Sequence, residues 1–245
     1  VTATIAAGDG PLAMAEADGI WVGNLFEGTV RRIDPATNRI DRVIRLPKSP
    51  AGLAQDDSGG LWISSGFGSS LTRIDRASGT VTRTFDPGGR RSGAIAYAFG
   101  SLWLVGIGDH GVARIDPATG KRTALVQAGD EPLVVAEALG AIWVTNTGES
   151  SVIRIDPESN RIVATVDVGQ APTAIASDSR WVFVVNRASN SVSRIDPATN
   201  RVVATIPVPG EPTAAGLGAG GVWVLTTAAK RISRIDPVTE TVTAT

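Results

Sequence analysis

Residues 191–212, SVSRIDPATNRVVATIPVPGEP, decide the fold, because the rest of the chain repeats this stretch with variation. The Arg-Ile-Asp core recurs before a turn, and its aspartates are 41, 41, 40, 40 and 40 residues apart: Asp34, Asp75, Asp116, Asp156, Asp196 and Asp236. An aromatic residue between aliphatic residues runs in step with the aspartates: Trp21, Trp62, Trp103, Trp143, Phe183 and Trp223. A fixed period of about 40 residues predicts a repeat architecture.

The local pattern within one repeat indicates strands. Its apolar runs, residues 181–185, 192–195 and 202–206, are short and rich in β-branched and aromatic residues. Turn residues such as Asp-Pro-Ala-Thr-Asn and Pro-Gly-Glu-Pro separate these runs. No window carries apolar residues at helical spacing over the length of a typical helix. The sequence therefore predicts an all-β, six-bladed β-propeller with four antiparallel strands per blade, forming a single domain over residues 1–245.

The two ends of the chain carry copies of the same strand. Residues 1–4 and 242–245 both read Val-Thr-Ala-Thr, and both match the last strand of a repeat. We expect the N-terminal copy to pair in the last blade, because closing the ring removes exposed strand edges. The last C-terminal residues are then expected to be loose. Since the chain begins at Val1 rather than Met, we expect a mature or excised part of a larger protein.

Composition narrows the range of partners. The 23 basic and 24 acidic residues nearly cancel, so no global field favours nucleic acid or an anionic membrane. The absence of cysteine excludes a disulfide framework and a cysteine-based zinc site. The sequence shows no transmembrane run and no signal peptide. We therefore expect a monomer that binds no nucleic acid and does not insert into a membrane.

The loops sort onto two faces, because consecutive antiparallel strands are joined at alternating ends. The turn between the third and fourth strands, Asp-Pro-Ala-Thr-Asn and its variants, is nearly constant and suits side chains that bond their own backbone. The loops between the second and third strands, and the linkers between blades, vary freely. Binding residues are usually placed on such variable loops, so this loop face is the candidate site.

Ten loop-face residues differ in kind from their repeat equivalents: Phe26, Glu27, Phe67, Arg90, Arg91, Asp109, His110, Glu149, Arg187 and Lys230. Phe26 and Phe67 are loop aromatics of the kind that anchors ligands. His110 is the only histidine, and its ordinary pKa lies near neutrality. It is the candidate acid or base if the protein is an enzyme, and otherwise an ordinary surface residue.

The repeat positions that carry the same kind of residue in every blade are expected to have a structural role. The aromatic column should pack between blades, since burying one such side chain contributes about 4 to 6 kcal/mol before entropy is counted. The arginine of Arg-Ile-Asp should stack on a neighbouring aromatic ring or bond a turn carboxylate.

A metal site has only weak candidates. Glu16 and Glu137 occupy one repeat position in blades one and four, where a ring would place them across its channel. The matching positions in the other blades add no carboxylate, so the site would be poor in ligands for calcium: Gln55, Tyr97, Ser177 and Leu217. We therefore expect no metal or other cofactor, with Mg or Ca as the alternative. Asn24, Asn146 and Asn186 either face that channel or hydrogen-bond at strand ends.

One motif points to a family. Residues 143–146, Trp-Val-Thr-Asn, and residues 183–186, Phe-Val-Val-Asn, follow the pattern Tyr-Val-Thr-Asn. The chain resembles, over its whole length, the bacterial YVTN or YncE-like β-propeller repeat family. It is more distantly similar to virginiamycin B lyase-like and NHL propellers. The resemblance implies the propeller fold and leaves the activity open, because one fold carries many functions.

Three functions are compatible with the sequence. The first is a non-catalytic sensor or recognition domain of a bacterial extracytoplasmic or secreted protein, which binds a protein, peptide or glycan through the loop face. The second, suggested by virginiamycin B lyase-like and lactonase-like propellers, is a metal-assisted lyase or hydrolase. Against it, that lyase repeat usually reads Trp-Phe-Thr-Glu, whereas here each repeat aromatic precedes Val, Ile or Leu. The third is an assembly module without a small ligand. No nucleophile elbow, metalloprotease motif or phosphate loop is present.

Overall fold

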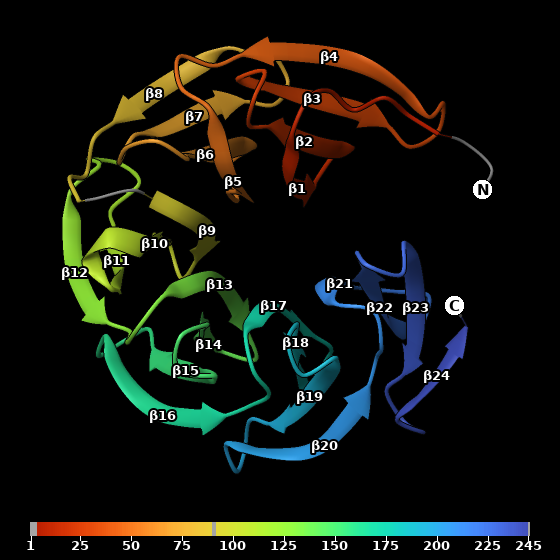
Figure 1. The fold of residues 1–245 in the computed structure, drawn as a ribbon. Coiled ribbons are helices and arrows are strands. Elements are labelled where there is room, and N and C mark those ends of the chain that lie inside the picture. The colour runs from red at the N-terminus through yellow and green to blue at the C-terminus, as the bar shows by residue number, and fades with distance from the viewer. Residues whose placement is uncertain (1–3, 90–91, 245) are drawn as a thin grey trace. The chain divides into compact units, whose positions relative to one another are not determined.

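The computed structural model describes residues 4–89 and 92–244, which form six four-stranded antiparallel sheets (Figure 1). Each sheet contains four strands that are consecutive in the chain. These sheets are the blades of a propeller, so the predicted all-β, six-bladed fold is confirmed. Within the described residues the one helical segment is a 3-10 turn, η1 (Ile107–Asp109), and no helix is long and apolar enough to cross a membrane.

The chain divides into two compact units, Val1–Leu125 and Val126–Thr245. That the two form a single domain stays a prediction. Blades one to three belong to the first unit, whose boundary falls inside the last strand of blade three. Their strands are β1 (Pro11–Glu16), β2 (Ile20–Asn24), β3 (Thr29–Asp34), β4 (Arg39–Arg45), β5 (Pro50–Gln55), β6 (Gly60–Ser65), β7 (Leu71–Asp75), β8 (Val81–Phe85), β9 (Ser92–Ala98), β10 (Ser101–Gly106), β11 (Gly111–Ile115) and β12 (Arg122–Gln127).

Blades four to six belong to the second unit. Their strands are β13 (Pro132–Ala138), β14 (Ala141–Asn146), β15 (Ser151–Asp156), β16 (Arg161–Asp167), β17 (Pro172–Ser177), β18 (Val182–Asn186), β19 (Ser191–Asp196), β20 (Arg201–Pro207), β21 (Pro212–Gly218), β22 (Gly221–Thr226), β23 (Arg231–Asp236) and β24 (Thr241–Ala244).

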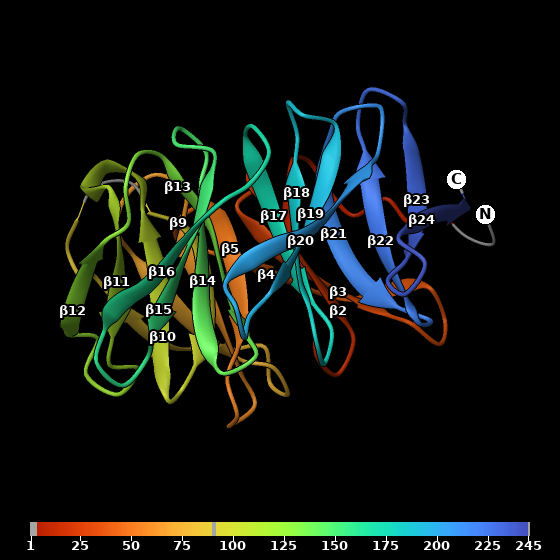
Figure 2. The same ribbon diagram turned by 90° about the horizontal axis from the view of Figure 1, so that it is seen from below.

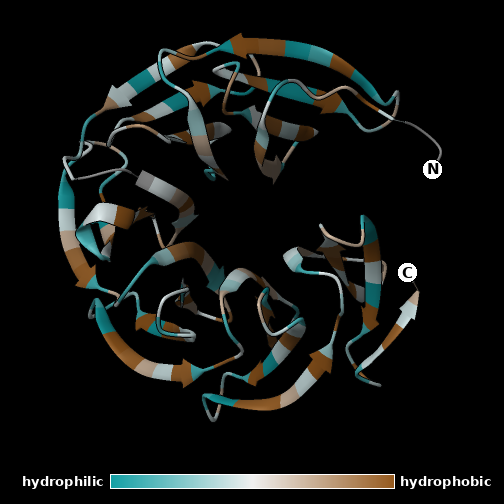
Figure 3. Cartoon of the chain, viewed as in Figure 1, coloured by the Kyte–Doolittle hydropathy of each residue, from teal (hydrophilic) through white to brown (hydrophobic). Residues whose placement is uncertain are grey.

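The second strand of each blade is the most buried, which explains its continuous run of apolar residues. Every residue of β6, β14 and β18 is buried, whereas the fourth strand β20 alternates between exposed and covered positions. Figure 2 shows the hairpins at both ends of the strands, and Figure 3 shows hydrophobic residues concentrated along the strands.

The repeat aromatics pack between neighbouring blades within each unit. Trp62 of blade two contacts the core of blade three around Leu102, and Trp143 of blade four contacts Val184 of blade five. The first five aromatics of the column are buried, whereas Trp223 is half-buried. Packing between blades is therefore confirmed for Trp21, Trp62, Trp143 and Phe183, and burial also for Trp103.

The turn between the third and fourth strands is constant because one of its positions requires a left-handed backbone. The Asp34 carboxylate accepts hydrogen bonds from Ala36 N at 2.9 Å and from the Thr37 hydroxyl at 2.9 Å, and the other blades repeat this local bonding. Four residues after each aspartate, φ lies between 54° and 74° in all six blades: Asn38, Gly79, Gly120, Asn160, Asn200 and Glu240. Asparagine and glycine tolerate this conformation best, which accounts for five of the six choices.

In the second unit, the repeat arginines connect one blade to the next. Arg154 donates to the carbonyl of Pro197 at 2.6 Å, and Arg194 donates to the carbonyl of Pro237 at 2.8 Å. The Arg154 guanidinium also lies 5.6 Å from the centre of the Trp143 ring. The expected stacking on aromatic rings is therefore present, and it is combined with a bond to the turn of the following blade.

In the first unit, arginines of the fourth strand make this connection instead. Arg42 donates to the carbonyl of Arg76, and Arg83 donates to the carbonyls of Pro117 at 3.0 Å and Ala118 at 2.9 Å. The turn carbonyls that receive an arginine are thus the same in both units, while the strand that supplies the arginine differs.

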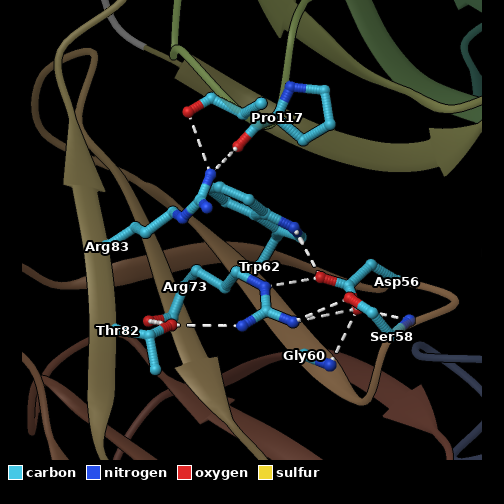
Figure 4. A network of polar contacts seen from close by, with 9 residues as sticks. Asp56, Ser58, Gly60, Trp62, Arg73, Thr82, Arg83 and Pro117 are labelled. Carbon is cyan, nitrogen blue, oxygen red and sulfur yellow. Dashed lines mark hydrogen bonds and ion pairs between the residues drawn. The ribbon is translucent and has the colours of Figure 1, made fainter.

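Blade two contains an ion pair between Asp56 and Arg73, and further hydrogen bonds surround the Asp56 carboxylate (Figure 4). The Asp56 carboxylate accepts from Arg73 Nε at 2.6 Å, from the Trp62 indole at 3.0 Å and from the backbone of Ser58 and Gly60 at 2.9 and 2.8 Å. Burial would raise the pKa of Asp56, but the hydrogen bonds from Arg73, Gly60 and Ser58 outweigh burial and hold this pKa well below its usual range.

One expectation about the last blade is wrong. Its fourth strand is the C-terminal β24, in which Val242 pairs with Ile235, and not the N-terminal copy of the same sequence. The reason is chain connectivity: the short turn closed by Glu240 N and the Asp236 carbonyl at 2.9 Å joins β24 to its partner, so pairing needs almost no loop closure. Residues 1–3, which were expected to close the ring, lie outside the described residues.

We predict that Asp56→Asn lowers the free energy of unfolding by about 3 kcal/mol at neutral pH, because it leaves the Arg73 charge without its partner. The folded-state pKa of Asp56 is depressed, so its stabilisation is complete above the unfolded-state pKa of about 4 and is lost as the pH falls below that value. Urea unfolding of both proteins at neutral and acidic pH measures this. The difference should shrink on acidification, and the exposed Glu158→Gln control should show no such difference. A difference independent of pH would contradict the prediction.

Candidate functional site

Backbone hydrogen bonds hold the variable loops against the linkers between blades. Gly66 N bonds the carbonyl of Ser49 at 2.9 Å, and Arg187 N bonds the carbonyl of Ala171 at 2.9 Å. In each case a loop between the second and third strands meets the linker that enters its own blade. Loops and linkers therefore share one face within each unit, as the strand order predicted.

Phe26 and Phe67 are the prominent apolar side chains on this face in the first unit. Their side chains are 73% and 69% exposed, although both are large and hydrophobic. A Cβ at Gly10 would come within 2.5 Å of the Phe26 ring, so this ring rests directly on the Gly10 backbone. The two loops touch each other, since a Cβ at Gly66 would lie 2.9 Å from the Leu25 side chain. Two exposed aromatic rings thus stand on adjoining loops.

The predicted charged residues are mostly paired within the loop face. Glu27 pairs with Arg31 at 2.8 Å and accepts a hydrogen bond from the Thr29 hydroxyl at 3.0 Å. The Thr29 hydroxyl bond, followed by the charge of Arg31, lowers the pKa of Glu27 below its ordinary value despite slight desolvation. Arg187 pairs with Glu211 at 3.1 Å, and both side chains are about half exposed. Such exposed pairs contribute little to stability.

Asp109 and His110 lie at the only short helical turn of the described chain. Asp109 is 3.8 Å from Arg122, and His110 ends the η1 turn in a left-handed conformation with φ of 50°. The His110 side chain is exposed.

The remaining candidates are spread over the face. Glu149 is exposed and accepts a hydrogen bond from Asp130 N at 3.2 Å, and Lys230 is exposed with φ of 50°. Arg90 and Arg91 lie outside the described residues.

The two glutamates proposed as weak metal ligands are both exposed. Glu16 ends β1, and Glu137 on β13 accepts a hydrogen bond from Gly140 N at 3.2 Å. Over residues 4–89 and 92–244, no group of three or more histidine, aspartate or glutamate side chains could hold a metal ion.

The three repeat asparagines form hydrogen bonds at the ends of their strands. Asn24, Asn146 and Asn186 are fully buried, and each donates to the hydroxyl of the residue that begins the next strand. Asn146 also donates to the carbonyl of Ala128 in the preceding linker. Of the two roles considered for these asparagines, the structure therefore supports hydrogen bonding at strand ends.

The second unit carries a cleft that the sequence did not predict. It has a volume of about 430 Å³ and lies between the linker after β16 and the loop that leads into β19. Its lining is rich in hydroxyl groups: Asp167, Val168, Gly169, Ser189, Asn190, Ser191, Ser193, Val202, Thr205 and Pro207. Ser193 lies in its wall, at the repeat position that carries Ile153 in the preceding blade. The same repeat position carries Ala113 and Ser233 in other blades, so side-chain size in the sequence does not identify this cleft.

The arrangement of the chain is similar to that of several solved propellers. Virginiamycin B lyase from Staphylococcus aureus has a TM-score of 0.81 at 19% identity, over 95% of this chain and 83% of that chain. Hydrazine synthase from Kuenenia stuttgartiensis has a TM-score of 0.79 at 16% identity, over 96% and 80%. A streptogramin B lyase has a TM-score of 0.71 at 17% identity, over 93% of each chain. No family model and no curated protein matches the sequence.

These similarities define a class by fold alone. The chain is a six-bladed propeller with the same blade architecture as the virginiamycin B lyases. At identities of 16 to 20% they do not transfer an activity. Membership of the YVTN or YncE-like family stays a prediction.

We predict that Asn146→Ala lowers the free energy of unfolding by about 1 to 3 kcal/mol, because it leaves buried polar groups of Ala128 and Ser151 without their donor. Glu149→Ala, on the adjoining loop and exposed, should change it by less than about 0.5 kcal/mol. Urea unfolding followed by tryptophan fluorescence measures both values. Equal stability of the two variants would show that Asn146 is not a structural residue.

Proposed function

We propose that this chain is a non-catalytic recognition propeller that binds a protein or peptide through its loop face. The observation that carries the proposal is the pair of exposed aromatic rings, Phe26 and Phe67, on adjoining loops. The proposal extends to a sensor or recognition domain of a bacterial extracytoplasmic protein, which acts as a monomer and contacts neither nucleic acid nor the membrane interior.

Physical chemistry supports aromatic anchors at this position. A fully covered phenylalanine removes about 150 to 250 Å² from water, and such residues dominate binding energies in many interfaces. The Phe26 loop is braced by the Gly10 backbone, and Leu25 N bonds the carbonyl of Gly10 at 2.8 Å. The Phe26 ring is therefore held before a partner arrives, which lowers the entropy cost of binding. Lys48 beside Gly68 adds a cation at the rim.

Selection from a displayed random peptide library, with the whole chain as bait, tests the proposal. Peptides that bind the unaltered protein should lose at least about tenfold in affinity for the double variant Phe26→Ala and Phe67→Ala, as measured by calorimetry. Because both rings are exposed, the double variant should unfold at nearly the same urea concentration as the unaltered protein.

Val238→Ala provides the matched control. Val238 is 85% exposed on the turn between β23 and β24, so its truncation removes an apolar side chain outside the loop face. Peptide affinity should not change in this variant. Equal binding to the double variant, or a library that yields no binder, would contradict recognition of a peptide through these rings and would direct the search to glycans.

A metal-assisted lyase or hydrolase is the second candidate, because two of the similar structures are streptogramin-type lyases. In it His110 would be the acid or base, and Mg or Ca the metal. A metal bound at about 100 times its dissociation constant adds about 2.7 kcal/mol of stability. Under the recognition proposal we expect the same melting temperature with EDTA, calcium and magnesium. A rise with one cation that His110→Ala, Glu16→Gln or Glu137→Gln removes would favour the enzyme.

A further inference from the structure

A second cleft opens on the opposite face of the first unit, where the constant turns lie. It has a volume of about 330 Å³, within the range of small-molecule sites. Blades two and three both contribute to its walls: Asp56, Ser58, Trp62, Arg73, Arg83, Tyr97, Pro117 and Ala118. None of these residues belongs to the loop face, so this cleft is separate from the recognition site proposed above.

Arg83 is held in this cleft with one edge of its guanidinium open. Its Nη1 donates to the carbonyls of Pro117 at 3.0 Å and Ala118 at 2.9 Å, which uses both hydrogens of that nitrogen. Within residues 4–89 and 92–244, its Nε and Nη2 have no hydrogen-bond partner. The Nε and Nη2 hydrogens of an arginine lie parallel and match the two oxygens of a carboxylate. The two carbonyls therefore fix the side chain and leave its carboxylate-binding edge free.

The other charges of the cleft are already satisfied. Arg73 donates through Nε to Asp56 at 2.6 Å, through Nη1 to Thr82 at 3.2 Å and through Nη2 to Ser58 at 3.0 Å. Asp56 and Arg73 form a neutral pair on one side of the Trp62 indole, and Figure 4 shows Arg83 on the other side of this ring. Asp116 lies within electrostatic reach of Arg83, but no carboxylate of the described residues forms an ion pair with the Arg83 guanidinium.

Two carboxylates near the cleft are held by their own hydrogen bonds. The Asp116 carboxylate accepts from Ala118 N at 2.7 Å and from the Thr119 hydroxyl at 2.9 Å. Asp57 is hydrogen-bonded to the Tyr97 hydroxyl, and burial together with the charges of Asp57 and Asp56 raises the pKa of Tyr97. The phenol therefore stays neutral and acts as a donor to Asp57.

The remaining wall is aromatic. Tyr97 is partly buried against the cluster that contains Trp62, and the Phe85 ring stacks on Trp62 with ring centres 6.0 Å apart. This stacking fixes the indole, and the Tyr97 ring comes from the first strand of the next blade. A flat apolar group placed against the exposed part of the Tyr97 ring would leave water without breaking any existing hydrogen bond.

We propose that this cleft binds a small planar carboxylate, whose two oxygens accept from Nε and Nη2 of Arg83 while its flat body lies against the partly buried Tyr97 ring. The site needs no rearrangement of the Asp56–Arg73 pair. It does not depend on the loop-face proposal, and either can fail without the other.

Benzoate is the test probe, with benzamide as its uncharged match. Saturation-transfer NMR on the whole chain should show benzoate binding at millimolar concentrations, and benzamide should bind at least about tenfold more weakly. In Arg83→Lys the ammonium can still donate to the Pro117 and Ala118 carbonyls but lacks the paired edge, so benzoate affinity should fall at least about tenfold with little change in melting temperature.

Arg42→Lys is the matched control, because Arg42 makes the equivalent bond to the next blade outside the cleft. It should bind benzoate like the unaltered protein. Arg83→Gln, which loses the charge, should bind no benzoate. Benzoate binding that survives in Arg83→Lys and Arg83→Gln, equal binding of benzamide, or no binding to the unaltered protein would each overturn the proposal.

Discussion

Packing of aromatic side chains between blades is the interaction on which the structure depends. Among the described strands, the backbone ladders end at the edges of each four-stranded sheet, and none joins one blade to the next. Contacts such as Trp62 against Leu102, and Trp143 against Val184, supply this connection within each unit. Each buried indole must also satisfy its N–H group, and the backbone of the preceding turn provides the acceptor for Trp103 and Trp143. Blades one and two differ, because the carboxylates of Asp18 and Asp56 accept from the indoles of Trp21 and Trp62.

Arginine side chains add a second connection between blades, because they donate to backbone carbonyls in the turns of the next blade. This requirement helps to explain why the turn face of the repeat is constant. Turn carbonyls at Pro117 and Pro197 receive arginines from the preceding blade. A turn that must bond its own aspartate, hold a left-handed residue and accept an arginine leaves little freedom for substitution. The loops at the other end of the strands are joined to the linkers by backbone bonds in each unit, and the side chains that add to these bonds differ from blade to blade, so this face can vary and can serve recognition.

The solved structures of similar fold show how little the fold restricts the chemistry. Streptogramin-type lyases and a hydrazine synthase share this blade arrangement at 16 to 20% identity. Function must therefore be argued from side chains. In the described residues these are a pair of exposed aromatic rings on the loop face, a hydroxyl-rich cleft beside Ser193, and an arginine with an open edge on the turn face.

The sequence by itself determined the period, the strands and the face that varies, because these follow from side-chain alternation and turn chemistry that act over a few residues. It also identified Phe26 and Phe67 as unusual loop residues, and their exposure agrees with this interpretation. Only the tertiary structure decided which terminal copy completes blade six, since both copies have the same local propensity and differ only in the chain that connects them. It also decided the role of Arg83, whose partners Pro117 and Ala118 are more than thirty positions away. Backbone carbonyls carry no sequence signal, so a cleft built around them becomes visible only when the blades are packed together.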